Sequence, residues 1–227
     1  MATHGKKYKS IREKAPAEAL ELDKAIDFLK QNHYAKFDET MEIGIRLGID
    51  PTKSENMVRG TVSLPHGTGR KVKVIVFATG AAADAATAAG ADVVGFEDLI
   101  EKVKGGWCDF DVAVATNEAM KEVRKLGKVL GPRGLMPNPK TGTVTENTAQ
   151  AVKESKAGKV EFRMDKHGNV NVAFGKLSFD TLKLAENANV IINAVKAEKP
   201  AGAKGIFMKN CTVSSTMGVG VKVKVSE

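Results

Sequence analysis

Side chains that could do catalytic or metal chemistry are scattered along this 227-residue chain, and none of them forms a familiar catalytic pattern. Cys108 and Cys211 are the two cysteines, and they give neither a disulfide framework nor a zinc-ligand spacing. Residues 65–71 (PHGTGRK) lack the spacing of a phosphate-binding P-loop and precede a predicted strand rather than a helix. No HExxH or GxSxG motif occurs. We therefore expect no catalytic residues, no metal site and no cofactor.

Short polar segments suited to binding occur at three places. The first is 35–40 (AKFDET), where Phe37 stands beside Lys36 at the predicted entry to a strand. A phenylalanine at this position could pack flat on a base or a ribose. The alternative is that Phe37 caps the hydrophobic core, and the residues alone favour that alternative.

The second segment is 214–218 (SSTMG), which is predicted to connect two strands. Its hydroxyl groups, including those of Ser215 and Thr216, suit contacts with phosphates and ribose 2′-hydroxyls. Met217 has a flexible thioether that adapts to an irregular surface, and Gly218 would let a ligand approach the backbone closely. An ordinary Ser/Thr turn is the alternative, and chemistry alone favours it.

The third segment is 163–168 (RMDKHG), a predicted hairpin turn that carries the cations Arg163 and Lys166. Cations at a tight turn suit phosphate contacts. His167 stands beside them, and we interpret it as a solvated turn residue rather than as a catalytic one.

A fourth segment, 130–144 (LGPRGLMPNPKTGTV), is rich in glycine and proline. Proline removes a backbone donor and glycine admits unusual backbone conformations, so we predict an ordered, stiff loop rather than a helix or a central strand. Between residues 123 and 145 there is no acid, but there are five bases: Arg124, Lys125, Lys128, Arg133 and Lys140. This charge favours a surface for polyanions, and an ordinary loop with solvated charges is the alternative.

The overall composition also favours an acidic partner. The net charge is +8 and the pI is near 9.4, which suits nucleic acid or an anionic membrane. Aromatic residues make up only 5%, so a stacking platform for single-stranded RNA is poorly supplied. The N-terminal residues lack a secretion signal, and no run of about 18 apolar residues occurs. Because cysteines are few, we expect a reducing, cytoplasmic location away from membranes.

The elements that must position these segments differ between the flanks and the middle of the chain. The flanks alternate apolar and polar residues as half-buried antiparallel strands do, at residues 41–47, 58–64, 160–164, 170–174, 206–213 and 219–225. Two amphipathic helices are predicted there, one from Pro16 to about Asn32 and one from Ser178 to about Pro200. Residues 1–15 are predicted to be a flexible or edge-lying basic arm.

The middle of the chain has nearly continuous apolar runs, typical of strands buried on both faces, at residues 72–77, 92–94 and 110–115. They alternate with predicted helices at residues 81–89, 96–103, 118–126 and 145–155. Asn117 is the candidate N-cap of the third helix, and 142–144 is a further short strand. Alternation of strand and helix predicts a small α/β domain with a mostly parallel sheet.

This change of pattern predicts one domain inserted into another. We expect 1–67 and 158–227 to form a split domain, and 68–157 to form the inserted one. Glycines near the two crossings form the candidate hinge: Gly67, Gly69 and Gly158. Residues 70–156 carry 13 bases against 11 acids, so most of the net positive charge lies in the split domain.

Several segments together resemble one protein family. Residues 130–144 closely resemble the signature loop of the first-numbered large-subunit ribosomal proteins, which build the mobile stalk beside the exit site. The likeness includes Gly131, Pro132, Arg133, Gly134, Met136, Pro137, Asn138, Pro139 and Lys140. Residues 35–47 and 58–69 and the run Thr216-Met217-Gly218 also match the family pattern. That family often has proline next, where this chain has Val219, and this difference indicates a less rigid turn.

The resemblance implies a two-layer split domain that carries an inserted, Rossmann-like, three-layer α/β domain. It also implies a non-enzymatic protein, monomeric when free, that binds large-subunit ribosomal RNA and its own messenger RNA. It further implies a role in releasing deacylated tRNA from the exit site of the ribosome and in repressing translation of its own operon. The RNA-binding residues implied by the motifs are Lys36, Phe37, Thr40, Arg163, Lys166, Ser215, Thr216, Met217 and Gly218.

The alternative function is a nucleotide-dependent enzyme that uses the inserted domain. Thr79 and Gly80 follow a predicted buried strand and precede a predicted helix, as a nucleotide-binding turn would. The GxGxxG fingerprint does not follow that strand, so the signal is weak.

Overall fold

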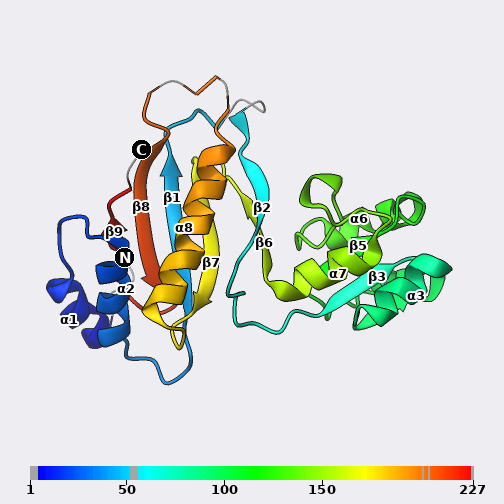
Figure 1. Ribbon diagram of the computed structural model, residues 1–227, viewed down its shortest axis with the longest axis horizontal. Coiled ribbons are helices and arrows are strands. Elements are labelled where there is room, and N and C mark those ends of the chain that lie inside the picture. The colour runs from blue at the N-terminus through cyan, green and yellow to red at the C-terminus, as the bar shows by residue number, and fades with distance from the viewer. Residues whose placement is uncertain (1–4, 52–55, 201, 204, 226–227) are drawn as a thin grey trace. The chain divides into compact units, whose positions relative to one another are not determined.

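The structure, a computed structural model, describes residues 5–51, 56–200, 202–203 and 205–225. The chain divides into two compact units (Figure 1). The first consists of the chain up to Gly69 together with the chain from Val160 onward, and the second consists of Arg70–Lys159. Helices and strands are mixed in both, which confirms the α/β class expected from the sequence.

The first unit contains a four-stranded antiparallel sheet in the order β7-β1-β8-β9. Its strands are β1 Thr40–Leu47, β7 Asn169–Lys176, β8 Met208–Ser215 and β9 Val221–Val223. In β1, alternate residues such as Met41 and Ile43 are buried, and Glu42 between them is exposed, as the alternating pattern predicts. A separate two-stranded sheet joins β2 Arg59–Ser63 to β6 Lys159–Arg163.

Helices cover one face of the four-stranded sheet, so this unit has two layers (Figure 1). They are α2 Leu22–Gln31 and α8 Thr181–Ala197, and α1 Lys6–Lys14 packs against the same core through Tyr8 and Ile11. α2 and α8 pack against each other and against the sheet, and they bury Ile26, Leu184 and Ile191 completely. No helix in the described part of the chain is long and apolar enough to cross a membrane.

Two expectations for the N-terminal region are wrong. Residues 6–14 form α1 rather than a flexible arm, because Tyr8 and Ile11 pack against the core of the unit. Residues 1–4 lie outside the described part. The helix expected from Pro16 begins only at Leu22, because Leu20 is extended and forms a parallel bridge with Val223 at the edge of the sheet.

The predicted hairpin around residues 165–169 has its turn, but its two strands separate. β6 pairs with β2 and β7 pairs with β1, so the two strands meet only at a bridge between Met164 and Val170. Alternation in the sequence predicts that a segment is a strand, but it does not identify the partner strand.

The second unit contains a parallel sheet in the order β4-β3-β5, with helices on both faces. Its elements are β3 Val74–Phe77, α3 Ala81–Ala88, β4 Val93–Gly95, α4 Glu97–Lys104, β5 Val112–Ala115, α5 Met120–Val123, α6 Gly127–Leu130 and α7 Thr148–Ala157. Ile75 and Phe77 face an apolar cluster with α4, whereas Val74 and Val76 face another cluster with α3 and α7. These three layers agree with the expected Rossmann-like arrangement.

The helix expected at residues 118–126 is divided into α5 and a 3₁₀ turn, Arg124–Leu126, before α6. Asn117 does not cap it, because its side-chain amide donates to Glu146. The hydroxyl of Thr116 instead accepts the backbone N–H of Ala119. The strand expected at 142–144 is reduced to an isolated bridge between Ala115 and Val144.

The candidate hinge glycines all have positive φ, at +64° for Gly67, +70° for Gly69 and +109° for Gly158. The side-chain amide of Asn187, on α8, donates to the carbonyl oxygen of Gly67. A Cβ at Gly69 would lie 2.9 Å from the ring of Phe179. The first two glycines are therefore packed tightly within the first unit.

Candidate nucleic-acid interface

Two predicted binding segments, far apart in the sequence, lie at the same end of the four-stranded sheet. β1 begins at Thr40 and β8 ends at Ser215, and these strands run antiparallel with Met41 opposite Ser215 (Figure 1). The antiparallel register therefore makes 35–40 and 214–218 neighbours. We use the name Phe37–Met217 patch for the surface formed here by Phe37, Thr216, Met217 and Gly218.

Hydrogen bonds join Thr40 and Thr216 in both directions. The backbone N–H of Thr216 donates to the carbonyl oxygen of Thr40 at 3.1 Å. The backbone N–H of Thr40 donates to the hydroxyl of Thr216 at 3.0 Å. The hydroxyl of Thr40 accepts from Nζ of Lys176 at 2.8 Å. Both threonines therefore help to hold the two segments together.

A buried carboxylate, Glu39, holds the segment that carries Met217. Its Oε2 accepts the hydroxyl of Ser215 at 2.6 Å and the backbone N–H of Met217 at 2.9 Å. Hydrogen bonds to a charged acceptor are about twice as strong as neutral ones. Glu39 was not among the predicted site residues. A signal was nevertheless present, because Glu39 lies two residues before Met41, and the alternation of β1 therefore places both on the same face.

The expected contact between the Ser215 hydroxyl and RNA is not available in the structure. Ser215 is only 4% exposed, and its hydroxyl donates to Glu39. The alternation along β8 explains this, because Val213 and Ser215 face the core together. Ser215 therefore supports the loop from inside.

Phe37 and Met217 are the exposed apolar members of the patch, with 54% and 47% of their surfaces accessible. The exposed fraction of Phe37 rules out the alternative in which the ring serves mainly to cap the core. The hydroxyl of Tyr34 donates to the carbonyl oxygen of Met217 at 2.7 Å, which fixes the backbone from the outside. Exposed apolar groups on a fixed backbone suit packing against the flat faces of bases and riboses.

Gly218 occupies a position where no side chain fits. A Cβ there would lie 2.4 Å from Oγ of Ser215. The backbone N–H of Gly218 donates to the carbonyl oxygen of Ser215 at 3.0 Å, which closes the turn. Val219, where the resembling family often has proline, is buried in the core and anchors the turn from the other side.

Arg163 and Lys166 lie at the opposite end of the sheet. The turn that carries Lys166 adjoins the end of β1, where Arg46 pairs with Asn169. A strand of 8 residues spans roughly 24 Å at about 3.4 Å per residue. The structure therefore does not bring these two cations to the Phe37–Met217 patch.

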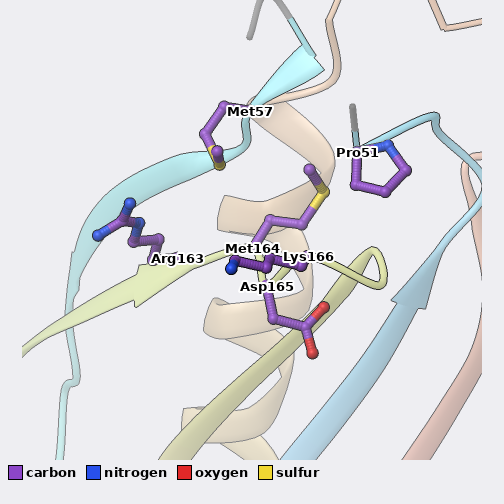
Figure 2. A pocket seen from close by; sticks show the side chains of 6 residues that line it. All are labelled: Pro51, Met57, Arg163, Met164, Asp165 and Lys166. Carbon is purple, nitrogen blue, oxygen red and sulfur yellow. The ribbon is translucent and has the colours of Figure 1, made fainter. Parts of the chain in front are cut away.

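A pocket lies at this opposite end, lined by Pro51, Met57, Arg163, Met164, Asp165 and Lys166 (Figure 2). Figure 2 shows the thioether of Met164 between Met57 and Pro51. Among the described residues, neither Arg163 nor Lys166 takes part in an ion pair.

Asp165 organises the turn beside this pocket. Its Oδ1 accepts the backbone N–H of Asn169 at 2.7 Å and that of His167 at 2.8 Å. The bond from Asn169 is the main cause that lowers the pKa of Asp165 below its ordinary value, and the bond from His167 adds to it. His167 is exposed, as expected for a solvated turn residue.

The glycine- and proline-rich segment 130–144 lies in the second unit and is ordered by its own hydrogen bonds. The backbone N–H of Asn138 donates to the hydroxyl of Thr143 at 2.8 Å. The side-chain oxygen of Asn138 accepts the backbone N–H of Lys140 at 2.9 Å, and its carbonyl oxygen accepts the hydroxyl of Thr141 at 2.9 Å. The expectation of a defined loop is therefore confirmed.

The features that the enzyme alternative would use have little to support them. Gly80, after Thr79, has φ of +61° at the start of α3, but the GxGxxG fingerprint of a dinucleotide-binding turn does not follow β3. In the ranges that the structure describes, no three His, Cys, Asp or Glu side chains are grouped so that they could hold a metal ion. Burial raises the pKa of the Cys211 thiol to about 11, which keeps it protonated.

A comparison with models of known protein families gives a match over most of the chain. The model of the ribosomal protein L1p/L10e family matches residues 29–219. The matched range contains the Phe37–Met217 patch, the pocket beside Arg163 and the loop at 130–144.

Proposed function

The chain belongs to the ribosomal protein L1p/L10e family, and from this premise we propose that it binds large-subunit ribosomal RNA at the mobile stalk. In this proposal it is a structural component of the ribosome in the cytoplasm, with no enzymatic activity and no cofactor. It assists the release of deacylated tRNA from the exit site and represses translation by binding its own messenger RNA. It is a monomer when free.

The observation that carries the proposal is the Phe37–Met217 patch. Two exposed apolar side chains stand on backbone that internal hydrogen bonds hold in place, and Glu39 supplies two of those bonds. A surface that is already ordered loses little entropy when it binds. The patch therefore suits a structured RNA whose bases and riboses offer matching flat surfaces.

Charge supports the same partner. The first unit, up to Gly69 and from Val160 onward, has 21 bases and 16 acids, against 14 bases and 11 acids in Arg70–Lys159, so it carries the larger net positive charge. Long-range attraction brings an RNA to this unit, and close packing on Phe37 and Met217 then selects among RNAs. Lys36, beside Phe37, and the pair Arg163 and Lys166, at the far end of the sheet, contribute phosphate contacts in this proposal.

The two units have different roles in the proposal. The split domain, 1–67 and 158–227, carries the specific RNA contact. The inserted domain, 68–157, moves relative to the split domain at the junction for which Gly67, Gly69 and Gly158 were the candidate hinge. Because Gly67 and Gly69 are packed against Asn187 and Phe179, we place the motion on the chain that follows them rather than at these glycines.

The experiment that tests this function is a salt titration of RNA binding by the full chain. One RNA is a fragment of the ribosomal stalk, and the other is an unrelated structured RNA of equal length. We expect far tighter binding of the stalk RNA, with a difference that persists at high salt. If the two RNAs bind alike and both affinities fall steeply with salt, the net charge alone explains the binding and the proposal is wrong.

A further inference from the structure

We propose that the segment 130–144 and the two short helical turns before it, Arg124–Leu126 and Gly127–Leu130, form a second RNA-binding surface that holds the phosphates of base-paired RNA without reading sequence. From here on, the name signature loop covers residues 124–144. This inference rests on the proposed function, because it assumes that the natural partner is a structured RNA. It concerns a different unit from the Phe37–Met217 patch and a different kind of contact.

Unpaired positive charge is the first observation. Four cations of the signature loop are exposed and form no ion pair within the residues that the structure describes: Arg124, Lys128, Arg133 and Lys140. A fifth, Lys125, pairs with Glu122 at 2.6 Å. Because no acid occurs between residues 123 and 145, no neighbour along the chain neutralises these four charges.

Elsewhere in the same unit, four cations form ion pairs with acids. The pairs are Arg70 with Asp111, Lys73 with Asp109, Lys156 with Asp92, and Lys159 with Glu154. Residues 70–156 have nearly balanced charges, with 13 bases and 11 acids. The positive charge of the signature loop is therefore a local feature and not a property of the whole unit.

The loop holds these cations on a fixed framework. Leu126 and Leu130 are buried in an apolar cluster beneath it, and Asn138 ties its second half together. A Cβ at Gly131 would lie 2.5 Å from the carbonyl oxygen of Gly127, so the backbone approaches itself too closely for a side chain. A fixed framework reduces the ordering cost when a ligand binds.

The side chains of the loop indicate which part of an RNA it contacts. The loop contains no aromatic residue, and Leu135 and Met136 pack against the core of the unit. Splayed bases of single-stranded RNA need stacking partners, which this surface lacks. Phosphates remain as the target, and the planar guanidinium of Arg133 can bind two phosphate oxygens at once. Base-paired RNA, whose bases are hidden in the stack, presents its phosphates in this way.

The test compares two triple variants of the full chain that lose equal charge from the same unit. One is Lys128→Gln, Arg133→Gln and Lys140→Gln. The matched control is Lys102→Gln, Lys104→Gln and Lys153→Gln, which are also exposed but lie beside acids on α4 and α7. For each protein, the affinities for the stalk RNA and for the unrelated structured RNA are measured over a series of salt concentrations.

In the signature-loop variant, we expect the logarithm of the binding constant to fall less steeply with the logarithm of the salt concentration. The slope should be shallower by about 0.7–0.9 for each phosphate that the variant no longer neutralises. Its affinities for the two RNAs should fall by the same factor, because phosphates carry no sequence information. The control variant should have nearly the slope of the unaltered protein. Thermal unfolding checks that all proteins are folded.

Equal slopes for the two triple variants would overturn the inference. So would a loss confined to the stalk RNA, since that result would mean that the loop reads a specific site. Failure of the proposed function is a separate result, in which the unaltered protein does not discriminate between the two RNAs. The slopes on either RNA still report on the signature loop in that case.

Discussion

The Phe37–Met217 patch and the signature loop are binding surfaces built in opposite ways. The patch joins segments that are 178 positions apart in the sequence, through Glu39 and the backbone N–H of Met217. The signature loop is ordered by bonds between near neighbours, such as that between Asn138 and Thr143. One surface presents apolar groups, whereas the other presents unpaired cations.

This difference bears on what each surface can recognise. Apolar packing is short-ranged and depends on fit, so it requires a backbone positioned from several sides. Charge attraction acts over about 10 Å at ordinary salt and tolerates imprecise geometry. A single substitution should therefore damage the patch severely, whereas the cations of the signature loop should contribute gradually and nearly additively.

The largest expected effect follows from removing the buried carboxylate of the patch. Glu39→Ala leaves the hydroxyl of Ser215 and the N–H of Met217 without their acceptor. We expect the free energy of unfolding to fall by about 3 kcal/mol, on the scale of hydrogen bonds to a charged group. Affinity for the stalk RNA should fall as well. Chemical denaturation and RNA binding measure the two effects.

Glu39→Gln is the control for this prediction, because it keeps an acceptor oxygen while removing the charge. Its loss of stability should be clearly smaller. If Glu39→Ala is as stable as the unaltered protein and binds RNA equally well, then Glu39 does not hold the patch.

The next effect concerns the apolar surface of the patch itself. Met217→Asp should weaken binding of the stalk RNA by about 1–3 kcal/mol, the scale of one mismatched base pair in a nucleic-acid interface. The exposed position should leave folding intact. Leu182→Asp is the matched control, because Leu182 is an exposed apolar residue of the same unit that lies on α8 outside the patch. Equal losses of affinity in both variants would count against a specific patch.

A separate effect, on stability, is expected from filling the space at Gly218. The Cβ of Gly218→Ala would meet Oγ of Ser215 at 2.4 Å, so either this hydroxyl turns away from Glu39 or the backbone shifts. Such overpacking costs about 1–3 kcal/mol of stability. Gly127→Ala, within the signature loop, meets no atom within 4 Å and should be neutral or slightly stabilising. Thermal unfolding of the two variants compares the regions directly, and equal destabilisation would contradict the difference between them.

The smallest effect is expected at the turn of Asp165, at the end of the sheet away from the patch. Asp165→Asn should cost less than about 0.5 kcal/mol at neutral pH, as for an exposed residue. The pKa of Asp165 is lower in the folded protein, so its stabilisation is present above its ordinary value of 3.8 and is lost as the pH falls through the folded value. The difference in the free energy of unfolding between Asp165→Asn and the unaltered protein should therefore disappear in acid. A difference that grows in acid would contradict the conclusion that ionised Asp165 stabilises the turn.

Local patterns in the sequence predicted most of the elements but not their partners. Alternation located β1 and β8, and nearly continuous apolar runs located β3 and β5. Tertiary packing decided the failures. Residues 6–14 form a helix where an arm was expected, because Tyr8 and Ile11 pack against the core. Leu20 is not helical, because it forms a bridge with Val223 at the edge of the sheet.

The candidate site shows the same limit. Phe37 and Met217 were indicated by motif, and their exposure agrees with a binding role. Their support by Glu39 depends on the antiparallel register of β1 and β8, which no local pattern specifies. The separation of Arg163 from the patch depends on the same register, so a list of candidate residues could not reveal it.

The proposal that the patch, and not the net charge, selects the RNA is tested most directly by one ratio. It is the affinity for the stalk RNA divided by that for the unrelated structured RNA, measured at one salt concentration for the unaltered protein and for Met217→Asp. We predict that the ratio is large for the unaltered protein and falls about tenfold or more in the variant, on the scale of one mismatched position in such an interface. A folded Met217→Asp protein that keeps the full ratio would contradict the proposal.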